Sequence, residues 1–231
     1  MWINLQREIT GCATCPRLVA YRERVATEKR RQYRHETYWG RPLPAFGNPD
    51  ARLVIIGLAP AAHGGNRTGR MFTGDSSGLW LARALHQSGF ANQPTSERRD
   101  DGLTLHDALI TAAVRCAPPD NKPTPAEFAA CRPFLIRELE LLKGAAVVVA
   151  LGKLAFDAYL TARSDMGRSV PKPRPAFGHG AAHAFPDGVT LIASYHPSRQ
   201  NTQTGRLTAA MLSRVFRSAR RVLDQPRGRR R

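Results

Sequence analysis

Residues 57–75 have the sequence GLAPAAHGGNRTGRMFTGD, and this stretch decides how the rest of the chain is organised. It follows the fully apolar run 53–56, which predicts a buried strand, and precedes an amphipathic segment at 76–86, which predicts a helix. Its five glycines and one proline let the backbone approach a ligand closely, and its polar side chains exceed what a turn needs. Because long loops inside compact domains are usually functional, we interpret the stretch as a binding loop and not as an ordinary surface loop.

Strands and helices alternate along the rest of the chain. The elements expected are strands at 52–57, 108–114, 145–151 and 189–194, and helices at 77–88, 125–142, 152–162 and 203–223. Such alternation implies right-handed crossovers and a parallel sheet. We therefore predict an α/β fold with three α/β/α layers and a central four-stranded parallel sheet. A single domain is expected over 1–223, and the basic residues 224–231 are expected to form a disordered tail.

Polar or reactive residues follow three of the predicted strands. The loop at 57–75 follows the first strand, Cys116 follows the second, and His196 follows the fourth. Ligands of open α/β sheets bind outside the carboxyl ends of the strands. We therefore expect these three elements to lie along one edge of the sheet.

Charge is the unusual feature of the composition. The 231 residues include 35 Lys and Arg against 18 Asp and Glu, a formal net charge of +17. This excess favours a polyanion such as nucleic acid as the partner. An arginine-rich composition without functional meaning explains the charge equally well.

No apolar segment suits secretion or membrane insertion. Residues 1–11 are polar and charged, and the longest apolar run, 145–151, is far shorter than a membrane span. We expect a soluble, monomeric, cytoplasmic protein with no membrane partner. In that compartment, four cysteines favour metal binding or redox chemistry over disulfide formation.

The four cysteines combine one close pair with two separated residues. Cys12 and Cys15 form a C-x2-C pair, whereas fourteen residues lie between Cys116 and Cys131. Four thiolates suit either zinc or a four-iron cluster. A zinc site normally uses two close pairs, so the spacing favours a cluster, and four unrelated buried cysteines are the alternative.

Three separated signatures occur in this chain: GLAPAAHG and FTGD within 57–75, the four cysteines, and HPSRQNTQTGRLT from His196 onward. With these, the chain resembles the uracil-DNA glycosylase superfamily from Cys12 to about Leu223, and it is most similar to the family 5, UDGb-type, iron–sulfur enzymes. The resemblance implies a uracil-DNA glycosylase-like three-layer fold and a [4Fe-4S] cluster on the cysteines. It also implies hydrolysis of the N-glycosidic bond of uracil, and of other deaminated bases, in DNA, which leaves an abasic site.

Two departures from related branches of the superfamily bear on the chemistry. Where those branches place a polar residue that activates water, this chain has Leu58 and Ala59. This is typical of the UDGb type, and it leaves Asp75 as the natural carboxylate. Where a sister family carries an asparagine that reads uracil, residues 111–113 are Thr-Ala-Ala. We therefore expect tolerance of hypoxanthine or other deaminated bases.

The resemblance also assigns roles to individual residues. Asp75 is expected to orient water or stabilise the sugar cation, and His196, helped by backbone N–H groups of the 58–64 loop, to stabilise the leaving base. His63 and Asn66 are the alternatives to Asp75 for positioning water. Phe72 is expected to stack on the base. Further contacts to the base are expected from Gly57, Ala59, His63 and Asn121, although Asn121 suits a turn equally well. Beside the two signature loops, contacts to DNA are expected from Arg67, Arg70, Ser198, Arg199 and Arg206, and each arginine suits a solvated surface equally well.

Two other classes of protein are consistent with the cysteines and the charge. A redox protein would need a second cofactor site, and no G-x-G-x-x-G fingerprint follows any predicted strand. A noncatalytic iron–sulfur DNA-binding module would not need Asp75 or His196. Mutation of these two residues therefore separates such a module from an enzyme.

Overall fold

The computed structural model describes residues 1–225, and four parallel strands form the centre of its sheet. They lie in the order β3 (Ala108–Ala112), β2 (Leu53–Gly57), β4 (Val147–Leu151) and β6 (Thr190–Ser194). One row of paired residues runs across all four strands through Ile110, Ile55, Val149 and Ile192. The four predicted strands and their parallel arrangement are therefore confirmed.

Two short antiparallel strands extend the sheet beyond the four predicted ones. Strand β1 (Phe46–Gly47) pairs with β3, and β5 (Ala182–Ala184) pairs with β6, so the sheet has six strands within the described residues. The prediction of a four-stranded sheet was thus wrong in its strand count. Strands of two or three residues are too short to produce a recognisable periodicity, and both lie in segments rich in Pro and Gly.

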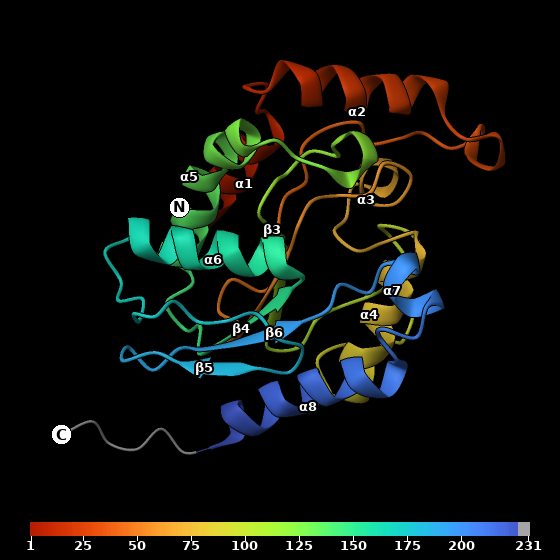
Figure 1. The fold of residues 1–231 in the computed structure, drawn as a ribbon. Helices are drawn as coiled ribbons and strands as arrows, with labels where there is room; N and C mark the ends of the chain where they lie inside the picture. Colours follow the sequence, from red (N-terminus) through yellow and green to blue (C-terminus); the bar gives the residue numbers. More distant parts are fainter. Residues whose placement is uncertain (226–231) are drawn as a thin grey trace.

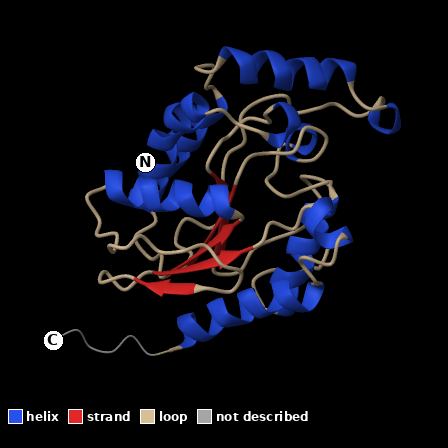
Figure 2. Cartoon of the chain, in the orientation of Figure 1, coloured by secondary structure: helices blue, strands red, loops and turns tan. Residues whose placement is uncertain are grey.

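Helices cover both faces of the sheet, as Figures 1 and 2 show. Helices α4 (Ser76–Gln87) and α8 (Ala209–Asp224) pack on one face. Helices α5 (Pro125–Leu141) and α6 (Lys153–Asp165) pack on the other, with α1 (Trp2–Thr10) against α5. Successive residues of β2 point to opposite faces, so Ile55 and Ile56 belong to different halves of the core. The three-layer prediction is confirmed.

Side-chain caps fix where several helices begin. Thr124 and Glu127 form a reciprocal capping box at the start of α5. Ser198 caps α7 (Arg199–Gln203), and Thr208 caps α8. The helix predicted at 203–223 therefore begins later, at Ala209, and the short helix α7 before it was not predicted.

The remaining helices lie around the loop at 57–75 and in the N-terminal segment. Helix α3 (Gly65–Thr68) is a single turn inside that loop, and α2 (Pro16–Glu28) lies beside it. Short 3-10 helices occur at Arg31–Tyr33 (η1) and Pro119–Asn121 (η2). Within 1–225, no helix has the length and apolarity needed to cross a membrane. Most of the basic tail predicted at 224–231 lies outside the described residues, whereas Asp224 still belongs to α8.

Candidate active site

The loop at 57–75, called the recognition loop below, joins the carboxyl end of β2 to α4 and folds the Phe72 ring back onto the strand end. A Cβ at Gly57 would lie 2.8 Å from Cε2 of Phe72, so glycine is needed for this approach. Phe72 has a φ of 49°, which is the left-handed region that side chains rarely adopt. Backbone strain of this kind concentrates at ligand sites, which agrees with the stacking role expected of Phe72.

His196 lies beside this ring, as the sequence predicted. The ring centroids of Phe72 and His196 are 5.8 Å apart, at 35° to one another. His196 follows β6, and its Cβ would lie 3.4 Å from a Cβ at Gly152, which follows β4. Segments that follow three parallel strands thus meet at one edge of the sheet.

Burial sets the protonation state of His196. Removal of the imidazole from water lowers its pKa to about 4. The side chain is therefore neutral at neutral pH and can donate a single N–H. Its backbone carbonyl accepts a hydrogen bond from Asn201 Nδ2 at 2.9 Å, which ties the His196 segment to α7.

The two carboxylate oxygens of Asp75 have different surroundings. It is the N-cap of α4, and its Oδ1 accepts a hydrogen bond of 2.8 Å from the Gly78 amide. Its other oxygen, Oδ2, lies against Gly64, where any Cβ would overlap it. Burial raises the pKa of Asp75, and the Gly78 and Ser77 amides oppose that rise. One carboxylate oxygen therefore faces the recognition loop while the other holds the helix.

Gly64→Ala is expected to lower the rate of uracil release from DNA by about 10²-fold. A Cβ at this position would overlap Oδ2 of Asp75, so the carboxylate must move from its present position. Single-turnover kinetics measure the effect. Gly11→Ala is the matched control, since a Cβ there is 3.5 Å from its nearest neighbour, an ordinary contact. Equal rates in the two variants would show that the position of Asp75 does not matter.

The two alternatives to Asp75 have partners elsewhere. His63 Nδ1 is 3.0 Å from the Tyr38 hydroxyl, and burial, Arg30 and Arg67 lower the pKa of His63. Asn66 is fully buried and donates from Nδ2 to the Arg22 carbonyl, whereas its Oδ1 has no hydrogen-bond partner within the described residues. These contacts favour Asp75 as the carboxylate that meets water or sugar.

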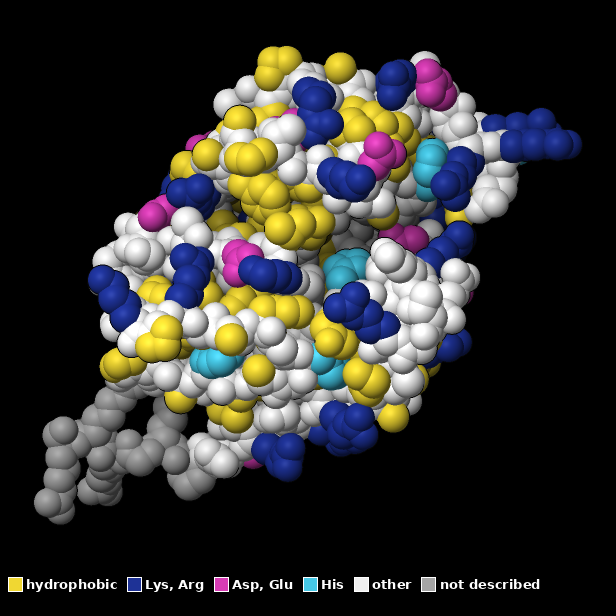
Figure 3. Space-filling model, viewed as in Figure 1, with side chains coloured by type: hydrophobic (Ala, Val, Ile, Leu, Met, Phe, Trp, Pro, Cys, Tyr) yellow, Lys and Arg dark blue, Asp and Glu magenta, His cyan; other side chains and the backbone are white. Residues whose placement is uncertain are grey.

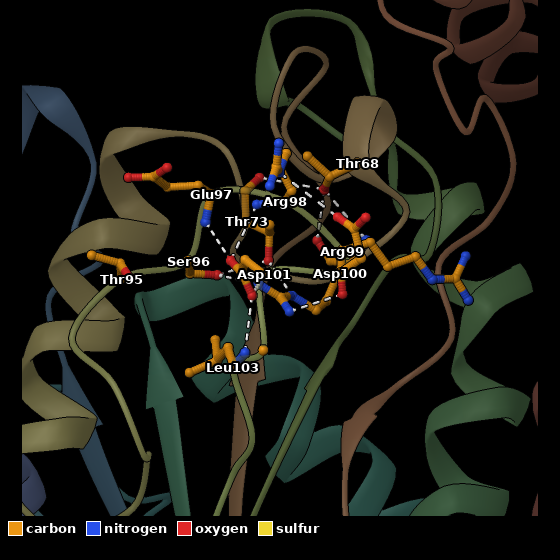
Figure 4. A network of polar contacts seen from close by, with 12 residues as sticks. Thr68, Thr73, Thr95, Ser96, Glu97, Arg98, Arg99, Asp100, Asp101 and Leu103 are labelled. Atoms are coloured by element: carbon orange, nitrogen blue, oxygen red, sulfur yellow. Dashed lines mark hydrogen bonds and ion pairs between the residues drawn. The ribbon is translucent and has the colours of Figure 1, made fainter.

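Arg67 and Arg70, expected to contact DNA, are 6% and 5% exposed and lie in internal networks. Arg67 donates to the carbonyls of His63 and Gly74. Arg70 Nη2 donates to both carboxylate oxygens of Asp101, at 2.8 and 2.9 Å, and Figure 4 shows Asp101 in a network of polar contacts. Asp101 also accepts hydrogen bonds from the backbone amides of Glu97, Arg98 and Leu103.

Breaking a buried pair such as Arg70–Asp101 leaves an uncompensated charge, which typically costs about 3–5 kcal/mol. The arrangement therefore does not favour phosphate contacts by Arg67 and Arg70. It fixes the FTGD end of the recognition loop instead, because Arg70 Nε also donates to Thr73 at 2.8 Å.

The other residues expected to contact DNA are accessible. Arg199 and Arg206 are exposed, and the positive charge of Arg199 lowers the pKa of Asp75, which places it near the carboxylate. Arg206 lies over the Tyr195 ring at 4.7 Å. Ser198 is partly exposed, and its hydroxyl accepts from the Asn201 amide at 3.4 Å. In Figure 3, histidine side chains border a hollow in the middle of one face, with basic side chains around it.

Two of the residues expected at the base lie nearer to other features. Asn121 is exposed, with a φ of 56°, at the end of η2. No described contact brings it to Phe72 or His196, and its role remains a prediction. Ala59 is partly buried and packs against Leu18, Val114 and two cysteines. The recognition loop is therefore in contact with the cysteine region.

The four cysteines line a single pocket, although they lie far apart in the sequence. All four thiols are free, and Cys116 and Cys131 are buried. Burial raises the pKa of Cys116 and raises that of Cys131 to about 11. Within residues 1–225, no group of three or more His, Cys, Asp or Glu side chains forms a ready metal site.

Two buried arginines complete this pocket, and the sequence did not identify them. Arg22 Nη1 donates to Cys116 Sγ at 2.9 Å. Arg22 Nε and the Nε and Nη1 of Arg115 are buried without a hydrogen-bond partner in the described part of the chain. Buried N–H groups without a partner are costly, by about 1–3 kcal/mol each. The signals were available, since Arg115 precedes Cys116 and Arg22 lies two helical turns after Cys15.

Comparisons with known proteins show the family of this chain. The family model described as the uracil DNA glycosylase superfamily matches residues 44–220. A Type-5 uracil-DNA glycosylase of Thermus thermophilus is 51% identical over 93% of this chain and 94% of its own length. One of Pyrobaculum aerophilum is 48% identical over 91% and 88%. A Type-4 uracil-DNA glycosylase of Thermotoga maritima is 33% identical over 66% and 67%.

The family match covers the recognition loop, Asp75 and His196, and the half-identical relatives span nearly the whole chain. The chain is therefore a member of the uracil-DNA glycosylase superfamily.

Proposed function

We propose that this protein is a DNA repair enzyme that hydrolyses the N-glycosidic bond of uracil in DNA and leaves an abasic site. The observation that carries the proposal is the pairing of an aromatic face, Phe72, with a neutral imidazole, His196, at the sheet edge where the recognition loop begins, with the carboxylate of Asp75 at the other end of that loop. Relatives of about 50% identity that bear the name uracil-DNA glycosylase support it.

The chemistry follows from the environment of these three side chains. An enzyme that acts on a base must take the base out of the stack, and Phe72 offers a face on which it can lie. Bond cleavage leaves an oxocarbenium-like sugar and an anionic base. An N–H donor from His196 to the base oxygen stabilises that charge by roughly 3–4 kcal/mol. The carboxylate oxygen of Asp75 that faces the recognition loop, Oδ2, orients water or stabilises the sugar cation.

Specificity is expected to be broad. The hydroxyl of Thr111 donates to Glu138 at 2.6 Å inside the protein, and Ala112 and Ala113 have no polar side-chain atoms. Side chains 111–113 therefore offer no hydrogen bond to the edge of a base, so uracil is not selected there over hypoxanthine or other deaminated bases.

We further propose that the four cysteines hold a [4Fe-4S] cluster. Four free thiols line one pocket, and the unpaired guanidinium N–H groups of Arg22 and Arg115 suit an anionic group whose sulfur atoms accept hydrogen bonds. When bound, the cluster would cross-link the segments that carry the cysteines and would not take part in electron transfer. Cys15 caps α2, Cys131 belongs to α5, and Cys116 follows β3, so their ligation would fix the N-terminal segment to the sheet.

Cys131→Ser is expected to lose bound iron and acid-labile sulfide and to melt at a lower temperature, because α5 would lose its link to α2. Iron and sulfide assays and thermal unfolding measure both effects. Ala130→Ser, one residue earlier on α5, is the matched control. Unchanged iron content and melting temperature in Cys131→Ser would remove the cluster assignment.

A strand-scission assay tests the proposed function. The protein, without added metal, is incubated with a duplex that bears one uracil, and the product is treated with hot alkali. Cleavage at the uracil supports base excision, and a panel of deaminated bases then ranks the substrates. The alternative, a noncatalytic DNA-binding module, predicts binding without cleavage. We expect a monomeric cytoplasmic enzyme with DNA as its partner.

A further inference from the structure

Residues 29–35, KRRQYRH, form a strongly basic segment that the catalytic proposal does not use. This segment, called the basic arm below, follows α2 and includes η1. In Figure 1 it lies beyond the end of α2, on the side of the molecule where α3 and α7 are found, and Figure 3 shows basic side chains at that tip. Its exposed cationic residues are Arg30, Arg31 and Arg34, and His35 is exposed beside them.

The recognition loop holds the basic arm in place. The Arg67 guanidinium lies 3.9 Å from the centroid of the Tyr33 ring and forms an ion pair with Glu36. Just after the arm, the Tyr38 hydroxyl meets His63 at 3.0 Å. The partners in these contacts are His63 and Arg67, which both belong to the recognition loop. The arm is therefore a fixed neighbour of the candidate active site.

The charges of the basic arm are not neutralised by the protein. Within residues 1–225, Arg30, Arg31 and Arg34 form no ion pair, and the acidic residues next to the arm, Glu28 and Glu36, pair with Arg24 and Arg67 instead. Clustered like charges repel one another and add nothing to folding. Unpaired guanidinium groups on a segment that is anchored to the protein suit contacts to a phosphate backbone.

We propose that the basic arm binds the DNA phosphate backbone beside the nucleotide that enters the active site. The proposal rests on the function proposed above, and it gives Arg67 a new role. Arg67 does not contact phosphate itself but anchors the arm that does, through Tyr33 and Glu36. Such contacts position the duplex without reading its sequence.

The test compares two variants that lose the same charge. One replaces Arg30, Arg31 and Arg34 with Gln. The control replaces three exposed arginines of α8 with Gln: Arg214, Arg217 and Arg221. Affinity for a duplex is measured against salt concentration, with and without one uracil, and thermal unfolding confirms that both variants fold.

The logarithm of the affinity falls as the logarithm of the salt concentration rises, and each lost phosphate contact makes this negative slope shallower by about 0.9. For the arm variant, the slope is expected to be shallower than that of the wild type by about 2–3, and both duplexes should bind more weakly. The α8 variant is expected to keep the wild-type slope. Equal slopes in the two variants would overturn the inference and make the arm a solvated surface. A wild-type protein that binds through the arm but releases no uracil would refute the proposed function alone.

Discussion

Asp75→Asn is expected to slow uracil release by about 10²–10⁴-fold, the usual contribution of a positioned acid–base group. The fold should be unaffected, since the asparagine oxygen can still accept the hydrogen bond of the Gly78 amide and cap α4. Single-turnover rates at saturating enzyme measure the loss. Asp75→Ala should lose the same rate and also about 1 kcal/mol of stability, because the cap is gone. A wild-type rate in Asp75→Asn would remove the carboxylate from the mechanism.

The pH dependence of wild-type activity is a second test of the role of Asp75. Burial raises the pKa of this carboxyl above its ordinary value of 3.8. The reaction needs the ionised form, so activity should be full above that raised pKa and fall as the pH drops through it. The remaining activity of Asp75→Asn should lack this acid limb.

His196→Ala is expected to slow uracil release by about 10²–10³-fold, the effect of deleting one preorganised donor to a developing charge. DNA affinity should change little, because His196 acts on the leaving base and not on the phosphates. His86→Ala, which alters an exposed histidine of α4, is the matched control and should have the wild-type rate. With a pKa of about 4, His196 should also produce no inflection near its ordinary pKa of 6.5. A loss confined to DNA binding would contradict this role.

Strands β2 and β4 could be predicted from the sequence because each is a continuous apolar run buried on both faces, and β3 and β6 carry only Thr or Ser as polar interruptions. The edge strands could not, because two or three residues carry no periodicity. Helix α1 was missed, although its buried residues Leu5 and Ile9 are four positions apart, the spacing of one helix face.

The site residues that could be predicted are those that belong to a single segment with a distinctive sequence. The recognition loop and His196 have distinctive sequences, and the structure brings Phe72 and His196 together. Arginines were harder, because composition does not reveal burial. The sequence predicts that Arg70 is a surface cation, whereas the fold pairs it with Asp101, thirty-one residues away. The role of Arg22 and Arg115 could not be predicted, because it depends on four cysteines that are distant in the sequence and line one pocket with them in the fold.

The most direct test of the central claim is to measure free uracil. The protein, without added metal, is mixed in excess with a duplex that carries one uracil, and released base and abasic sites are counted together. The account predicts one free uracil for each abasic site from the wild type, and almost none from Asp75→Asn or His196→Ala in the same time. Tight binding by all three proteins with no free uracil from any would contradict it and would identify a noncatalytic DNA-binding module.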